Sequence, residues 1–201
     1  MPWNGEVEVF IRPPRLEDRV EFLAIRERDR DWLQRWEPIA PDPTKNLSTP
    51  GEYERFVADS VTDRRCRFLI WARQGALESI AGQAALNEII RGPLKQAFLG
   101  YWVSRAFSGE GVMTRALGLV LSHAFGPLGL HRVEANIQPH NATSIALVKR
   151  LGFRREGYSP KYLQIQGGWA DHERWAILSD EFGNAIPGGI DRGASRIDLR
   201  P

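Results

Sequence analysis

One stretch of the chain combines a glycine-rich loop with the start of a helix, a combination that binds anions. The loop reads Ser108-Gly109-Glu110-Gly111, and the residues after it carry apolar side chains at helical spacing. The first N–H groups of a helix lack partners inside the helix, and its dipole attracts negative charge there. Glycine lets the backbone adopt positive φ and approach a phosphate closely. The stretch indicates a phosphate or pyrophosphate site, although a ligand-free turn between strand and helix would use the same residues.

Two other phosphate-binding motifs do not fit this loop. No Gly-Lys-Ser/Thr follows it, which excludes a P-loop. Thr114 stands where a dinucleotide-binding fingerprint requires its third glycine. The Gly-x-Gly pattern alone therefore does not identify the ligand.

Hydrophobic periodicity places the elements that must position this loop. A strand at residues 96–103 leads into it. The helix that follows has one apolar face, formed by Met113, Ala116, Leu117, Val120, Leu121 and Ala124. Further helices are expected at residues 16–36, from Thr49, and from an Asn141 N-cap to Gly152. The remaining strands are expected at residues 7–12, 67–73, 79–90, 131–138, 153–158, 162–166 and 169–178.

The two ends of the chain carry weaker patterns. The first helix is expected to bury Leu16, Val20 and Leu23, and its charged segment at residues 26–31 to face solvent. From Gly183 the chain is Gly-rich and loses periodicity, so we expect a mobile tail at 183–201 after a single domain at 1–182.

Composition limits the classes of protein. A chain of 201 residues with 42% hydrophobic residues can bury one core, and a mixed net charge of +2 predicts no direct nucleic-acid binding. The lone Cys66 excludes an internal disulfide and suits a reducing compartment. The four histidines show no metal-ligand spacing, so no metal is expected. Without a signal peptide or a spanning apolar run, we expect a soluble cytoplasmic protein with no membrane partner.

A series of short motifs follows one another between residues 82 and 178. They are Ile89-Ile90-Arg91-Gly92, Leu99-Gly100-Tyr101-Trp102-Val103, Gly109-Glu110-Gly111-Val112-Met113-Thr114, His131-Arg132-Val133-Glu134-Ala135-Asn136, Pro139-His140-Asn141, Leu151-Gly152-Phe153, Glu156-Gly157-Tyr158, Tyr162-Leu163 and Trp169-Ala170-Asp171-His172. In this order they resemble the GNAT acyl-CoA N-acetyltransferases. Within that family the chain is most similar to the RimJ/RimL-type protein N-terminal acetyltransferases, and to the RimJ branch above all.

The resemblance implies an α+β GNAT fold, with a twisted, mostly antiparallel sheet of about seven strands flanked by helices. The sheet would splay open between residues 96–103 and 131–138, and the co-substrate acetyl-CoA would occupy that wedge. Its pantetheine arm would bond the backbone of Trp102 and Val103 and the side chain of Asn141. Its pyrophosphate would lie on Ser108, Gly109, Glu110, Gly111, Val112, Met113 and Thr114. Ser108 replaces the Gln or Arg of the family pattern, which removes one possible phosphate cation.

Acyl transfer requires a polarised thioester carbonyl and a proton for the departing thiolate. Many GNAT enzymes carry a tyrosine acid where this chain has Val148, and the resemblance to the RimJ/RimL branch offers Ser144 instead. Ser144 shares a helical face with Leu147, Val148 and Leu151, so its hydroxyl is expected to point inward. A serine that only bonds the preceding turn is the alternative.

The reaction also requires a neutral amine, and several residues could serve as its base. Glu134 lies on the strand that would line the wedge, on the same side as Asn136 by strand alternation. A salt bridge or simple solvation is the alternative role for Glu134. Glu88 is a second carboxylate near the expected acceptor cleft, and His172 is either a base or a structural partner of Asp171.

The acceptor is best matched by a protein α-amine. Its pKa of roughly 7.7–8.0 leaves about 25–40% neutral near pH 7.5, against about 0.1% for lysine. The sequence with its resemblance therefore predicts acetyl transfer to a protein N-terminus, by resemblance a small-subunit ribosomal protein beginning with Ala or Ser. The alternatives are a small-molecule amine acetyltransferase acting on an antibiotic, polyamine or amino acid, and a weakly catalytic CoA-binding ribosome-assembly or regulatory module.

Overall fold

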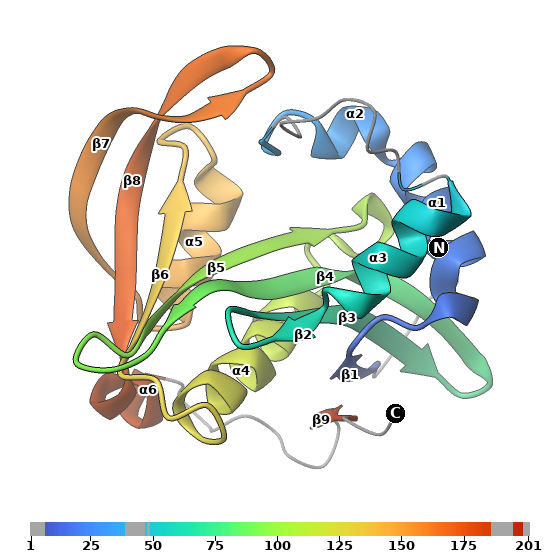
Figure 1. The fold of residues 1–201 in the computed structure, drawn as a ribbon, viewed down its shortest axis with the longest axis horizontal. Helices are drawn as coiled ribbons and strands as arrows, with labels where there is room; N and C mark the ends of the chain where they lie inside the picture. The colour runs from blue at the N-terminus through green and yellow to red at the C-terminus, as the bar shows by residue number, and fades with distance from the viewer. Residues whose placement is uncertain (1–6, 39–46, 48, 186–194, 199–201) are drawn as a thin grey trace.

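The computed structural model describes residues 7–38, 47, 49–185 and 195–198, which form one mixed sheet with helices on both faces (Figure 1). The strand order is β7-β8-β6-β5-β4-β3-β1-β9, with β2 paired to β3. The strands are β1 (Glu8–Arg12), β2 (Val61–Thr62), β3 (Arg65–Gln74), β4 (Leu77–Ile90), β5 (Gln96–Val103), β6 (Arg132–Ile137), β7 (Arg154–Ile165), β8 (Gly168–Leu178) and β9 (Ser195–Ile197). The helices are α1 (Arg19–Arg28), α2 (Arg30–Leu33), α3 (Pro50–Ala58), α4 (Val112–Phe125), α5 (Ala142–Arg150) and α6 (Ser179–Ala185), with short 3₁₀ turns η1 (Leu16–Asp18) and η2 (Arg105–Phe107).

The pairing confirms the predicted architecture with a few differences. Among the described strands only β5–β6 and β1–β9 run parallel, and the other neighbours are antiparallel. The described part of the sheet has nine strands where about seven were expected, because β2 and β9 are too short to show a period in the sequence. The two strands predicted at 153–158 and 162–166 are the single strand β7, whose pairing shifts register between Ser159 and Leu163.

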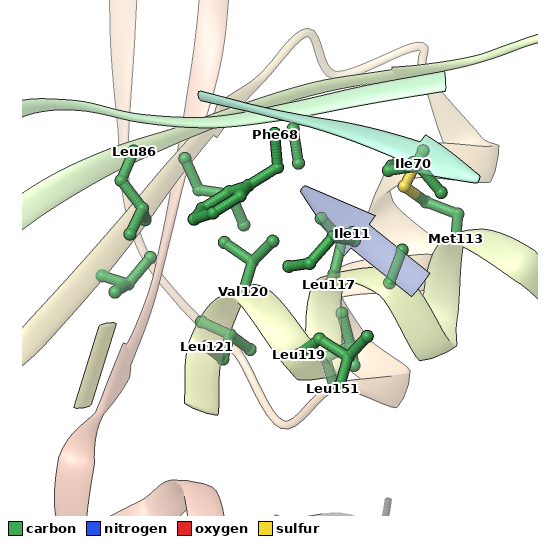
Figure 2. Packing of buried hydrophobic residues seen from close by; sticks show 14 of the residues in the cluster. Ile11, Phe68, Ile70, Leu86, Met113, Leu117, Leu119, Val120, Leu121 and Leu151 are labelled. Atoms are coloured by element: carbon green, nitrogen blue, oxygen red, sulfur yellow. The ribbon is translucent and has the colours of Figure 1, made fainter. Parts of the chain in front are cut away.

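Helix α4 packs its predicted apolar face against one side of the sheet. All six residues of the stripe are buried. Figure 2 shows Leu117 and Val120 of α4 close to Ile11 of β1 and Phe68 of β3. Burying one such side chain contributes roughly 1.5–3 kcal/mol, so this cluster holds the glycine-rich loop at the start of α4 in place.

The opposite face of the sheet is covered by α1 and α3, and here the predicted inner face of the first helix is only partly correct. Leu23 is partly buried against the core as predicted. Leu16 and Val20 are 56% and 77% exposed, whereas Phe22 and Ile25 are buried. The reason is that α1 begins only at Arg19, after a 3₁₀ turn, so its buried residues follow a different phase.

The charged segment at residues 26–31 is not a purely solvated face, because Asp29 is only 5% exposed. Its carboxylate accepts hydrogen bonds from the Arg28 side chain and from the backbone N–H of Arg105, each at 3.0 Å. Burial opposes its ionisation, but hydrogen bonds from Arg28, Ser104 and Arg105 outweigh burial and lower the pKa of Asp29. The junction of α1 and α2 is thereby tied to the chain that follows β5.

The C-terminal segment also differs from the predicted mobile tail. Residues 183–185 complete α6, and Ser195–Ile197 pair in parallel with β1. The backbone N–H of Asp198 then donates to the Ile11 carbonyl at 2.9 Å. The other residues of the expected tail lie outside the described part. Among the described helices, none combines the length and apolar character needed to cross a bilayer.

Candidate active site

Strands β5 and β6 separate along their length, as predicted. β6 pairs with residues 96–98 of β5, and β5 then continues to Val103 without a described strand on that side. The two strands and α5 diverge visibly in Figure 1. A cavity of about 390 Å³ fills the resulting wedge. Its lining comes from Arg67 of β3, from β4, β5 and β6, from the start of α5, from the β7–β8 hairpin and from residues 36–38.

The glycine-rich loop has the geometry expected of an anion site. Gly109 and Gly111 have φ of 89° and 72°, and Gly111 is the N-cap of α4. A Cβ at either glycine would meet no atom within 4 Å, so the space beside the loop is open. The first turn of α4 carries no acidic residue, and its first N–H groups, those of Val112, Met113 and Thr114, point out of the helix end. Binding of pyrophosphate by this loop stays a prediction.

A cation that the sequence did not reveal lies at this helix end. Arg150, the last residue of α5, donates through Nη1 to the Thr114 hydroxyl at 3.3 Å. The two residues are 36 positions apart, so no local spacing predicts the contact. Arg150 is therefore a candidate for the phosphate cation that Ser108 cannot be.

The end of β5 packs closely against β4. A Cβ on Gly82 would lie 2.3 Å from the Trp102 carbonyl oxygen, so only glycine fits at position 82. The Val103 carbonyl accepts a hydrogen bond of 3.1 Å from the Trp32 indole Nε1. Of the backbone groups predicted to bond pantetheine, the Trp102 carbonyl faces β4, and the Val103 carbonyl already accepts one hydrogen bond.

Ser144 lies inside the wedge, in the first turn of α5, and lines the cavity. Asn141 caps this helix as predicted, since its Oδ1 accepts from the Ser144 backbone N–H at 3.1 Å. The Ser144 hydroxyl is 2.5 Å from the Tyr101 hydroxyl, which comes from β5 across the wedge. Burial raises the pKa of Tyr101 to about 12, so this phenol keeps its proton at neutral pH. The sequence missed Tyr101 because only the fold brings it to Ser144.

Glu134 does not line the cavity, and its position supports the salt-bridge alternative rather than the base. Its carboxylate accepts from Arg132 Nε at 2.7 Å, and its side chain is 14% exposed. Arg132 also pairs with Glu156, which completes an ion-pair network on β6 and β7. Glu88 is likewise an exposed partner of Arg64 and does not line the cavity.

Asn136 of β6 and His172 of β8 line the cavity, and Tyr162 of β7 contacts both of them. Asn136 Nδ2 donates to the Tyr162 hydroxyl at 3.3 Å, and the Tyr162 and His172 rings are 5.7 Å apart. His172 is 3% exposed and lines the cavity. Its predicted contact with Asp171 is not present, because Asp171 instead accepts hydrogen bonds from Tyr158 and the Lys161 backbone.

Arg67 of β3 brings a positive charge to the cavity. Its Nη1 donates to the Phe56 carbonyl at 2.9 Å, and its guanidinium lies 4.2 Å from the Phe56 ring centroid. Burial lowers the pKa of Arg67 to about 10, and no carboxylate of the described residues pairs with it. Glu37, the only carboxylate among the described lining residues, is bound by both terminal nitrogens of Arg26.

Comparisons with known proteins agree with this geometry. Residues 8–154 match the acetyltransferase (GNAT) domain. The [ribosomal protein uS5]-alanine N-acetyltransferase of Escherichia coli is 35% identical, over 82% of this chain and 90% of its own length. The structure of Mycobacterium smegmatis RimJ in complex with CoA-disulfide superposes with a TM-score of 0.77 at 31% identity, covering 88% of this chain and 87% of RimJ. The structure of the ribosomal-protein-S5-alanine acetyltransferase of Vibrio fischeri superposes with a TM-score of 0.77 at 26% identity. The match covers 90% of this chain and 97% of the Vibrio protein. The chain therefore belongs to the GNAT acetyltransferase family and is an acetyl-CoA-dependent N-acetyltransferase.

Proposed function

We propose that this enzyme acetylates the N-terminal α-amine of a protein, a small-subunit ribosomal protein that begins with Ala or Ser. The observation that carries the proposal is the charge of the cavity. Arg67 lines it without a carboxylate partner among the described residues, and Glu37 is neutralised by Arg26. A polyamine brings several positive charges and would be repelled by such a site, whereas a peptide places a carbonyl oxygen beside its amine.

The relatives support the choice of acceptor. The E. coli relative is named for acting on an alanine of ribosomal protein uS5, and it matches over most of both chains. The α-amine also makes the smaller demand on the enzyme. The gap between the pKa of lysine and that of an α-amine corresponds to roughly 3.5 kcal/mol, which a lysine acetyltransferase must supply by other means.

Acetyl-CoA would lie in the wedge, and each wall has a role. The glycine-rich loop, the first turn of α4 and Arg150 would hold the phosphates, while Asn141 and the Val103 N–H on the free edge of β5 would hold the pantetheine arm. The amine nitrogen attacks the thioester carbonyl carbon, the C–S bond breaks, and the thiolate takes a proton through Ser144. Tyr101, bonded to the Ser144 hydroxyl at 2.5 Å, keeps that hydroxyl oriented across the wedge.

Mass spectrometry of a peptide panel incubated with enzyme and acetyl-CoA tests the proposal. The panel contains free Ala-, Ser- and Met-start peptides, the same peptides with blocked α-amines and internal lysines, and a set of small amines including a polyamine. Acetylation of the free Ala or Ser start alone is the expected result. Acetylation of small amines alone would make this a metabolite or drug acetyltransferase. CoA binding without turnover would favour the weakly catalytic module.

A further inference from the structure

The acceptor amine must lose a proton, and the ionisable groups in the cavity can be compared for that role. Among the described lining residues these groups are Glu37, Arg67, Tyr101 and His172. Glu37 is engaged by both terminal nitrogens of Arg26, and Arg67 is a cation. Tyr101 holds its proton, since burial raises its pKa to about 12. Only His172 is left to accept a proton at neutral pH.

The hydrogen bonding of His172 suits it for this task. Its Nδ1 is 3.0 Å from the Ala170 carbonyl oxygen, an acceptor only, so Nδ1 carries the proton. Nε2 is then a lone-pair acceptor. Burial lowers the pKa of His172, as does nearby His140, and these effects outweigh the Ala170 hydrogen bond and the negative charge of Asp171. The Tyr162 ring lies 5.7 Å from the His172 ring, and the Tyr162 hydroxyl accepts a hydrogen bond from the Asn136 amide.

Strand register places Asn136 on the same face as His172. Asn136 pairs with Arg174 across β6 and β8, and His172 lies two residues before Arg174 on that strand. Asn136 Oδ1 is buried and has no hydrogen-bond partner among the described residues. Buried polar atoms are almost always paired, so an orphan in the wall of a cavity marks a place for a ligand donor.

We propose that Asn136 and His172 form the binding site of the acceptor amine. Asn136 Oδ1 accepts a hydrogen bond from one amine N–H, and His172 Nε2 takes the proton released on attack. The inference rests on the proposed acetyl transfer to an amine and names the residues that receive it. As the N–C bond forms and the C–S bond breaks, the surplus proton of the amine passes to Nε2. The resulting imidazolium returns it to solvent, and the thiolate is protonated through Ser144.

The test is the pH dependence of kcat/KM for an Ala-start peptide, measured for wild type, His172→Gln and His172→Asn. The Gln side chain keeps a hydrogen-bond acceptor near the position of His172 Nε2 but cannot take the proton. The Asn side chain keeps an N–H donor to the Ala170 carbonyl. We expect both to lower kcat/KM by at least about 100-fold, the usual contribution of a general base. The acid limb of the kcat/KM profile should also change. In the wild type this limb depends on deprotonation of both the amine and His172, whereas in the variants it depends on deprotonation of the amine alone. Affinity for CoA should stay unchanged.

Two further variants separate the roles of His172 and Asn136 in the amine-binding site. His131→Gln makes the same change at an exposed histidine outside the cavity, and its rate and profile should match the wild type. Asn136→Leu should raise the acceptor KM about tenfold and leave the shape of the acid limb unchanged, because it removes a hydrogen bond and not a base.

The proposed amine-binding site is contradicted if His172→Gln has the same kcat/KM and the same acid limb as His131→Gln. It is also contradicted if Glu134→Gln alone removes the acid limb. If the wild type acetylates only a small amine, the proposed protein acceptor is wrong. The pH profiles of kcat/KM measured with that amine then decide the role of His172. If no amine is acetylated, both proposals are overturned.

Discussion

At Ser144 the structure shows a contact with strand β5 rather than with the preceding turn, and the catalytic role of Ser144 stays a prediction. The hydroxyl bonds Tyr101 across the wedge rather than a carbonyl of its own helix. We expect Ser144→Ala to lower kcat on the order of 100-fold, because proton delivery to the leaving group is lost. Ser122→Ala is the matched control, since Ser122 lies on α4 and bonds the Gly118 carbonyl of the preceding turn at 3.0 Å. Steady-state rates at saturating acetyl-CoA measure both, and equal effects of the two changes would remove Ser144 from the mechanism.

Arg150 makes a separate prediction about CoA affinity. Its contact with Thr114 puts a cation at the start of α4, where phosphates are expected. We expect Arg150→Gln to raise the Kd for CoA about fivefold, since an exposed charge contact is worth up to roughly 1 kcal/mol. The effect should shrink with added salt. Calorimetric titration with CoA measures it, and Arg64→Gln, at an exposed arginine paired with Glu88, should leave the Kd unchanged.

At the scale of elements, a close contact with β4 holds the end of β5, the strand that forms one side of the wedge. A Cβ at position 82 would collide with the Trp102 carbonyl oxygen, so Gly82→Ala must push the end of β5 away from β4. We expect a loss of roughly 1–3 kcal/mol in the free energy of unfolding, measured by urea denaturation, together with lower kcat. Gly51→Ala in α3 is the control, because a Cβ there meets nothing within 4 Å and should not destabilise. Wild-type stability in Gly82→Ala would contradict this account of the wedge.

Some elements could be predicted from sequence because their signals are local. The α4 stripe repeats at the helical period, and the loop before it needs glycine at positive φ, so both were predicted. The buried face of α1 could not be predicted from the sequence, because apolar residues occur on more than one side of this helix. Packing against Tyr53 and Trp71 determines that Phe22 and Ile25 are the buried residues.

The site was predictable only where one segment forms it. The Asn141 cap follows from the start of its own helix. Three contacts join residues that lie 43, 36 and 71 positions apart, so only the fold brings them together. They are Tyr101 with Ser144, Arg150 with Thr114 and Trp32 with Val103. Spacing therefore suggested Glu134 as the base, whereas Arg132 holds that carboxylate outside the cavity.

At the scale of the whole molecule, two buried histidines make folding stability depend on pH. Burial lowers the pKa of His123 and of His172 below the unfolded value of about 6.5. The unfolded chain then binds more protons than the native one as pH falls through that value, so the free energy of unfolding must decrease. We expect urea midpoints to be constant near pH 8 and to fall progressively from about pH 6.5 downward.

The contribution of His123 can be isolated because it lies away from the wedge. Its ring packs edge-on to Phe68 with centroids 5.4 Å apart, and its Nδ1 is buried without a partner among the described residues. His123→Leu should therefore flatten part of the decline below pH 6.5 without changing the acid limb of kcat/KM. His172→Gln should change both, since the same neutral imidazole would serve folding and proton transfer. A decline that persists unchanged in the double variant would show that other groups, such as the carboxylates, set the acid stability.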